Sequence, residues 1–141
     1  MAKQPLSLQA KAKAGRWDNR MLNGKSGDVT PAVRRFIRRG VAAGLVCTST
    51  TGGKHSAGSF HYQRWHGRGR AADLAAAMTR VGIWRMKRFY RREYRREKAF
   101  RGAQYAELFG PGRHYVKNGQ RLGGQMPGHS DHIHGAPAGY K

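Results

Sequence analysis

Acidic residues are scarce in this chain. Seven Asp and Glu stand against 28 Lys and Arg in 141 residues, which gives a formal net charge of +21. A chain this basic should repel itself and bind polyanions at low salt, so nucleic acid, anionic cell-wall polymers and the interior of a phage particle are candidate partners. Acid chemistry must draw mainly on Asp73, Glu107 and Asp131, because we expect Glu93 and Glu97 to be ion-paired within an arginine-rich helix.

The chain also has little sulfur and no long apolar run. Cys47 is the only cysteine, which excludes an intramolecular disulfide and argues against a cysteine-based zinc site. Its apolar, β-branched neighbours predict a small buried hydrophobe. No segment approaches the about 18 consecutive apolar residues of a transmembrane helix, so we expect no membrane span. The segment MAKQPLSLQAKAKAGRW lacks the apolar core of a secretory signal, so we expect no signal peptide.

The length and the local patterns predict one folded domain. Residues 1–28 are polar and rich in Gly and Lys, so we interpret them as a basic N-terminal arm or lead-in to a domain at 29–141. Thr30 can cap a helix whose first position is Pro31, and apolar residues follow at helical spacing. The β-branched run LVCTST (45–50) then predicts a buried strand.

The later segments alternate between strand and helix patterns. The Gly- and Ser-rich run from 51 to 69 predicts a long loop, and RAADLAAA (70–77) predicts a short strand that leads toward a helix. Residues 84–101 have helical propensity, with aromatic side chains near one face. YAELFGPG predicts a strand, YVKNGQRL a hairpin around its Asn-Gly pair, and HSDHIHGA a final strand. We therefore expect an α+β fold, a small antiparallel sheet with flanking helices.

Three of the seven histidines lie within six residues near the end of the chain, as His129-x-x-His132-x-His134. On a strand, His132 and His134 point to the same side of the sheet. Such a pair alone is also compatible with solvated or hydrogen-bonded side chains. A catalytic zinc takes three ligands from His, Asp or Glu and keeps one position for water. The segment SFHYQRWHGRGRAAD offers further histidines followed by Asp73 at the end of an apparent strand.

Together these two segments resemble the zinc metallopeptidases of peptidoglycan, which include D-alanyl-D-alanine carboxypeptidases and penicillin-insensitive murein endopeptidases. The family motifs are Ser-x-His-x-x-Gly-x-Ala-x-Asp and, in the endopeptidase branch, His-x-x-His-x-His. This chain has GSFHY…GRAADL and HSDHIH in the same order, and the resemblance spans roughly residues 30–136. It implies a D-Ala-D-Ala-peptidase/hedgehog-like fold, one zinc ion per chain, and hydrolysis of peptidoglycan peptides by a compact enzyme of the phage type.

The resemblance implies zinc ligands at the positions that match the motifs. Asp73 and His134 would bind zinc together with His61, which keeps the Ser-x-His-Tyr context. Five extra residues separate that context from the Gly-x-Ala-x-Asp segment. His66 keeps the family's distance to Asp73, so His66 is the alternative to His61.

The resemblance also implies catalytic neighbours of the ion. His132 would be the general base or an oxyanion partner, and His129 is a weaker candidate for the same role. The carboxypeptidase branch has a glutamate base just before its last ligand, whereas this chain has Ser130 and Asp131 there. This difference favours the histidine-assisted branch. Asp131 is expected either to orient an imidazole or to be a solvated strand-end residue, and Glu107 is expected to be structural.

The segment WRMKRFYRREYRREKAFR interleaves aromatic and basic residues. This pattern fits either a helix that follows a phosphate backbone or a surface helix whose aromatic side joins the core.

The predicted function is a zinc peptidase of peptidoglycan, on a phage virion or in the host cytoplasm before release to the wall. It could also contact other virion proteins. The alternative is a nucleic-acid-binding or virion structural protein with a non-catalytic peptidase-like fold, and a metal-dependent nuclease is a third possibility.

Overall fold

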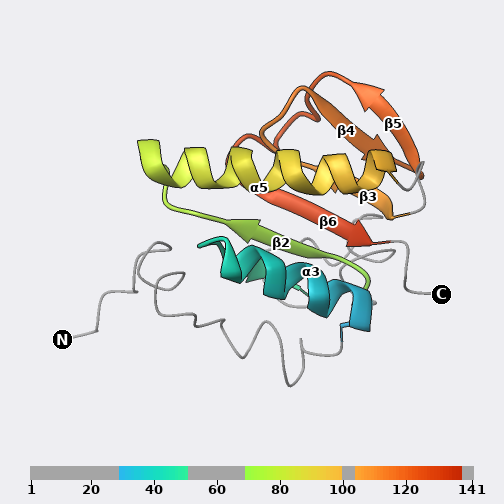
Figure 1. The fold of residues 1–141 in the computed structure, drawn as a ribbon, viewed down its shortest axis with the longest axis horizontal. Helices are drawn as coiled ribbons and strands as arrows, with labels where there is room; N and C mark the ends of the chain where they lie inside the picture. Colours follow the sequence, from blue (N-terminus) through green and yellow to red (C-terminus); the bar gives the residue numbers. More distant parts are fainter. Residues whose placement is uncertain (1–28, 51–68, 100–103, 138–141) are drawn as a thin grey trace.

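The computed structural model describes residues 29–50, 69–99 and 104–137. These residues form an α+β domain in which two helices cover a six-stranded antiparallel sheet (Figure 1), so the expected fold class is confirmed. The predicted arm at 1–28 lies outside the described residues. The same is true of His61 and His66.

The elements follow one another in an order that leaves the last strand at the centre of the sheet. The order in the sheet is β1-β2-β6-β3-β4-β5, so β6 lies between β2 and β3. Segments that are far apart in the sequence therefore become neighbours across β6. The elements are α3 (Pro31–Ala42), β1 (Val46–Ser49), β2 (Ala72–Ala75), α5 (Arg80–Ala99), β3 (Tyr105–Phe109), β4 (His114–Lys117), β5 (Gln120–Gly123) and β6 (Ile133–Pro137).

Capping residues determine where both helices begin. The Thr30 side chain accepts a hydrogen bond from the backbone N–H of Val33 at 3.3 Å, and a proline occupies the first turn of α3. The helix predicted to begin at Trp84 instead begins at Arg80. There the hydroxyl of Thr79 accepts from the Gly82 N–H at 3.1 Å, which caps the helix one turn earlier.

Both helices pack on one face of the sheet and form the core there. Phe36 of α3 lies 5.9 Å from the ring of Phe89 in α5 and 6.0 Å from the ring of Tyr105 in β3. Cys47 is buried in this core, as its neighbours predicted. The backbone of β6 comes close to Phe36, because a Cβ on Gly135 would lie only 2.5 Å from that ring. The helix side of β6 is therefore packed tightly enough to require glycine.

The two acidic residues of α5 differ in their partners. Glu93 is fully buried and accepts a hydrogen bond from Arg39 of α3 at 2.7 Å, so its predicted ion pair forms between helices. Glu97 is also buried, and it accepts from the backbone N–H of Tyr105 at 2.8 Å. The two carboxylates thus tie α5 to α3 and to β3.

The strand β3 contains an extra residue opposite β6. Tyr105 pairs with Pro137 while Glu107 pairs with Ala136, so Ala106 has no counterpart on β6. Strict alternation would place Tyr105 and Glu107 on the same face of the sheet. The bulge directs Tyr105 toward the helices and Glu107 toward the opposite face.

The two C-terminal predictions differ in their outcome. The Asn-Gly hairpin is confirmed: Asn118 and Gly119 connect β4 and β5 with φ of 52° and 73°. The last strand is shorter than predicted, because β6 begins at Ile133 and His132 precedes it. Gly128 turns the chain at φ 78°, and residues 129–132 do not join the ladder.

In the described part of the chain, no helix combines the length and apolarity that crossing a bilayer requires.

Candidate metal centre

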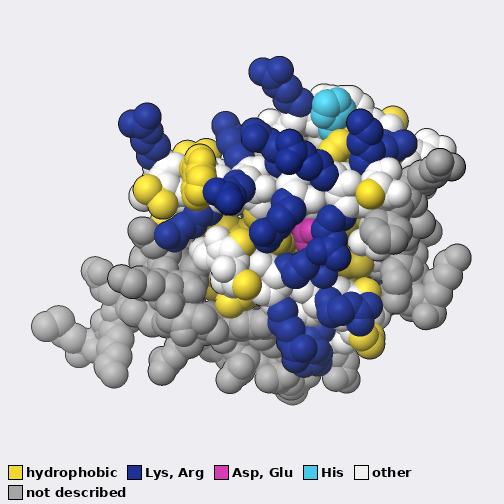
Figure 2. All heavy atoms as spheres, in the orientation of Figure 1, with side chains coloured by type: hydrophobic (Ala, Val, Ile, Leu, Met, Phe, Trp, Pro, Cys, Tyr) yellow, Lys and Arg dark blue, Asp and Glu magenta, His cyan; other side chains and the backbone are white. Residues whose placement is uncertain are grey.

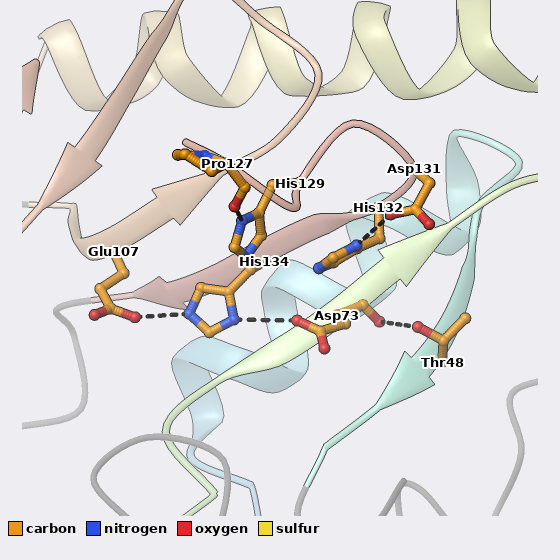
Figure 3. A network of polar contacts seen from close by, with 8 residues as sticks. All are labelled: Thr48, Asp73, Glu107, Pro127, His129, Asp131, His132 and His134. Carbon is orange, nitrogen blue, oxygen red and sulfur yellow. Dashed lines mark hydrogen bonds and ion pairs between the residues drawn. The ribbon is translucent and has the colours of Figure 1, made fainter. Parts of the chain in front are cut away.

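Asp73 and His134 meet on the face of the sheet that lies away from the helices. They are direct partners in the pairing of β2 with β6, so both side chains lie on the same face. The Asp73 Oδ1 atom lies 3.1 Å from His134 Nδ1 (Figure 3). The His134 side chain is fully buried. The two motif segments therefore contribute adjacent donor atoms.

Glu107 approaches the same imidazole from its other side. Its Oε2 atom lies 2.8 Å from His134 Nε2, so the ring lies between two carboxylates (Figure 3). Burial alone would lower the pKa of His134, but the hydrogen bonds and charges of Asp73 and Glu107 outweigh it and raise the pKa to about 9. Without a metal, both ring nitrogens thus carry protons at neutral pH and donate to the two carboxylates.

The turn before β6 adds two more imidazoles. The His129 Nδ1–H donates to the Pro127 carbonyl at 2.8 Å, and its ring lies 4.7 Å from that of His132 and 6.2 Å from that of His134. Burial lowers the pKa of His129, which favours its neutral form. This neutral ring has its Nε2 lone pair available as a proton acceptor.

His132 is oriented by its neighbour in the sequence. Its Nδ1–H donates to Asp131 Oδ1 at 2.7 Å, and this hydrogen bond lowers the pKa of Asp131. The Asp131 side chain is 63% exposed, whereas that of His132 is 26% exposed. Because Asp131 binds Nδ1, the Nε2 atom of His132 remains the position for proton exchange.

Phe109 fixes the positions of two of these histidine rings. Its ring stacks on His134 at a centroid distance of 5.2 Å and an interplanar angle of 23°. It also contacts His129 edge-on at 4.9 Å. The aromatic contacts and the two carboxylates together restrict rotation of the His134 ring.

Part of the predicted zinc ligand set is present in the described residues. Two donors about 2.0–2.1 Å from a tetrahedral zinc lie roughly 3.3 Å apart. The Asp73–His134 separation of 3.1 Å is close to this value, so the pair fits the ion with little movement. Within 29–50, 69–99 and 104–137, no three His, Cys, Asp or Glu side chains are arranged to hold a metal. Glu107 does not complete the set, because it binds the opposite nitrogen of His134. The predicted third ligand, His61 or His66, lies outside these residues.

The structure thus brings together five of the residues selected from the sequence: Asp73, His129, Asp131, His132 and His134. Phe109 was not predicted from the sequence, and Glu107 was counted among the available carboxylates but expected to be structural. The signal for both was the alternation in YAELF, which places Glu107 and Phe109 on one face of β3. The alternation within this segment could not indicate that β3 lies beside β6.

Comparison of the chain with protein-family models, with curated proteins and with solved structures finds no match.

Proposed function

We propose that the protein is a zinc metallopeptidase that hydrolyses peptide bonds of bacterial peptidoglycan, on a D-Ala-D-Ala-peptidase/hedgehog-like variant of the α+β fold. One observation carries the proposal: Asp73 and His134 come from two motifs 61 residues apart, yet their donor atoms lie 3.1 Å from each other. One Asp and one His, completed by His61 or His66, make a ligand set typical of a catalytic zinc site.

The residues around this pair have complementary roles. Asp73 and His134, with His61 or His66, would hold the zinc ion, which would supply a water molecule of lowered pKa and a Lewis acid for the peptide carbonyl. His132, oriented through Nδ1 by Asp131, can accept a proton at Nε2 and return it to the leaving amine. His129 lies beside His132 and provides a second, neutral imidazole. Phe109 is buried and contacts the rings of His129 and His134.

The test combines metal content with activity. Purified wild-type protein should contain about one zinc per chain by mass spectrometry, as the ligand set implies. It should also release new amino groups from peptidoglycan in a chelator-sensitive manner. His134→Ala and Asp73→Asn should lose both properties. His114→Ala is the matched control for zinc content, because His114 lies on β4 and stacks on Tyr94, away from Asp73 and His134. Absence of zinc from the wild type, even after reconstitution, would overturn the proposal.

The helix face supports an anionic partner. Lys and Arg side chains cover the face that carries α3 and α5, and little acidic surface is visible there (Figure 2). A hollow of about 740 Å³ lies between α5 and the β3–β4 turn, bordered by Lys87, Arg91 and Arg113. This surface suits anionic cell-wall polymers, which would hold a phage-borne or newly released enzyme against its substrate.

A second candidate function uses the same face without catalysis. Trp84 is 55% exposed, and the Arg88 guanidinium lies 5.1 Å from the centre of its ring. Exposed aromatic and basic side chains together are typical of surfaces that bind nucleic acid. Retention on DNA at physiological salt, combined with no zinc and no wall hydrolysis, would favour a nucleic-acid-binding or virion structural protein.

A further inference from the structure

Glu107 lies directly against the imidazole of His134. It lies on β3, 27 residues before His134, and its Oε2 atom reaches His134 Nε2 at 2.8 Å. It points there because the bulge at Ala106 reverses the alternation of β3. In a regular strand Glu107 would share the helix face with Tyr105. The backbone irregularity thus serves to place a carboxylate against the imidazole.

The two nitrogens of His134 consequently face different groups. Nδ1 faces Asp73, the neighbouring ligand of the proposed metal site, and Nε2 faces Glu107. A histidine that binds a metal through one nitrogen usually donates the N–H of the other to a carboxylate or carbonyl. That acceptor selects the tautomer and the ring orientation. Stacking by Phe109 keeps the ring in the same plane.

We propose that Glu107 is a positioning residue that accepts the Nε2–H of His134 and thereby keeps Nδ1 directed at Asp73 as the metal-binding atom. The inference depends on the proposed zinc site and adds a residue to it. Glu107 does not touch the substrate or the ion. It raises the affinity of the site by fixing the ring and by making the imidazole a stronger donor. The competing explanation is a buried carboxylate that only stabilises the fold.

The first experiment identifies the nitrogen that binds zinc. Protein labelled with ¹⁵N-histidine and loaded with zinc is examined by NMR, with His134→Ala to assign the signals. We expect His134 to carry a slowly exchanging proton on Nε2 and to bind zinc through Nδ1. Zinc on Nε2, with the proton on Nδ1, would overturn the positioning role but leave the proposed enzyme intact.

The second experiment measures zinc affinity by competition with a chelator. Glu107→Ala should weaken binding by about 10- to 100-fold, the usual effect of removing such a partner. Glu107→Gln keeps an acceptor oxygen without the charge, so its zinc affinity should fall less than that of Glu107→Ala. Glu97→Gln is the matched control, because Glu97 is also a buried, hydrogen-bonded carboxylate but packs on the helix side of the sheet. It should bind zinc like the wild type.

The outcomes separate the two proposals. If Glu107→Ala and Glu107→Gln fold and bind zinc as tightly as the wild type, Glu107 is structural only and the inference is wrong. If the wild type itself binds no zinc, the proposed function fails and the inference fails with it. If Glu107→Ala does not fold, the Glu107→Gln affinity and the wild-type NMR assignment still decide the question.

Discussion

Two histidines that are two residues apart differ completely in their surroundings. His134 is buried between two carboxylates, whereas His132 lies in the turn before β6 and is held by an exposed aspartate. The buried ring suits a fixed ligand, because burial, stacking on Phe109 and the hydrogen bond from Nε2 to Glu107 restrict its movement. The partly exposed ring suits proton transfer, since it can reach both water and a substrate.

At the residue scale, we predict that His132→Ala removes proton transfer without removing the metal. The kcat on peptidoglycan stem peptides should fall by about 10²- to 10⁴-fold, the usual contribution of a general acid–base. Zinc content should remain that of the wild type, because Asp73 and His134 are unchanged. Measuring both quantities on the same preparation checks this assignment. Loss of zinc together with activity would show that His132 is itself a ligand.

At the element scale, the central strand β6 carries chemistry on one face and tight packing on the other. His134 points to the site, and the next residue, Gly135, allows the Phe36 ring to contact the backbone. A side chain at Gly135 would separate β6 from α3 or displace Phe36. The alternation of the strand therefore couples the position of the site to the packing of the core.

We predict that Gly135→Ala destabilises the fold by about 1–3 kcal/mol, as expected when a methyl group is forced into a packed core. The added Cβ would lie 2.5–2.9 Å from the nearest Phe36 ring atoms. Urea unfolding followed by circular dichroism measures the change. Gly123→Ala on β5 is the control, because a Cβ there meets nothing within 4 Å. Equal stability of the two variants would contradict the proposed packing constraint.

Local sequence signals predicted the individual elements better than their arrangement. Thr30 with Pro31 predicted the start of α3, and Asn118 with Gly119 predicted the hairpin, because each pair acts through its own backbone conformation. The start of α5 was placed too late. Gly82 has low helix propensity, which argues against a helix at this position. The glycine is nevertheless required in the first turn of α5, because a Cβ there would lie 1.8 Å from the Ala77 carbonyl oxygen.

The site was predictable only as far as its motifs extended. Asp73 and His134 stand in recognisable patterns, and the pairing of β2 with β6 brings them together. Glu107 stands in no such pattern. Its role depends on β3 lying beside β6 and on the extra residue Ala106, and both arise from long-range pairing that no local window contains.

At the scale of the whole molecule, the two faces of the sheet have different characters. The candidate site lies on the face away from the helices, and the described part of the helix face is dominated by Lys and Arg (Figure 2). The hollow beside α5 is also lined by Ser130, in the turn that carries His129 and His132, so a polymer bound there would lie next to the candidate site. The charge in the hollow beside α5 should then contribute more to binding of an anionic polymer than the total charge of the protein does.

We predict that Lys87, Arg91 and Arg113, which border that hollow, contribute more to wall binding than other basic residues. Replacing all three by Gln should weaken retention on purified walls bearing phosphodiester polymers by about tenfold, at roughly 0.5 kcal/mol for each exposed charge. Replacing Arg35, Arg38 and Lys117, which are also exposed, by Gln removes the same charge elsewhere and is the matched control.

Co-sedimentation at increasing salt measures this difference, because screening weakens contacts between exposed charges. At every salt concentration, the control should lose less retention on the walls than the variant of Lys87, Arg91 and Arg113. Both variants should keep the wild-type zinc content. Equal losses would mean that the +21 charge acts as a whole and that the hollow has no special role. Unchanged retention on walls stripped of their phosphodiester polymers would contradict the assignment of the anionic partner, since no phosphate would remain for these side chains to bind.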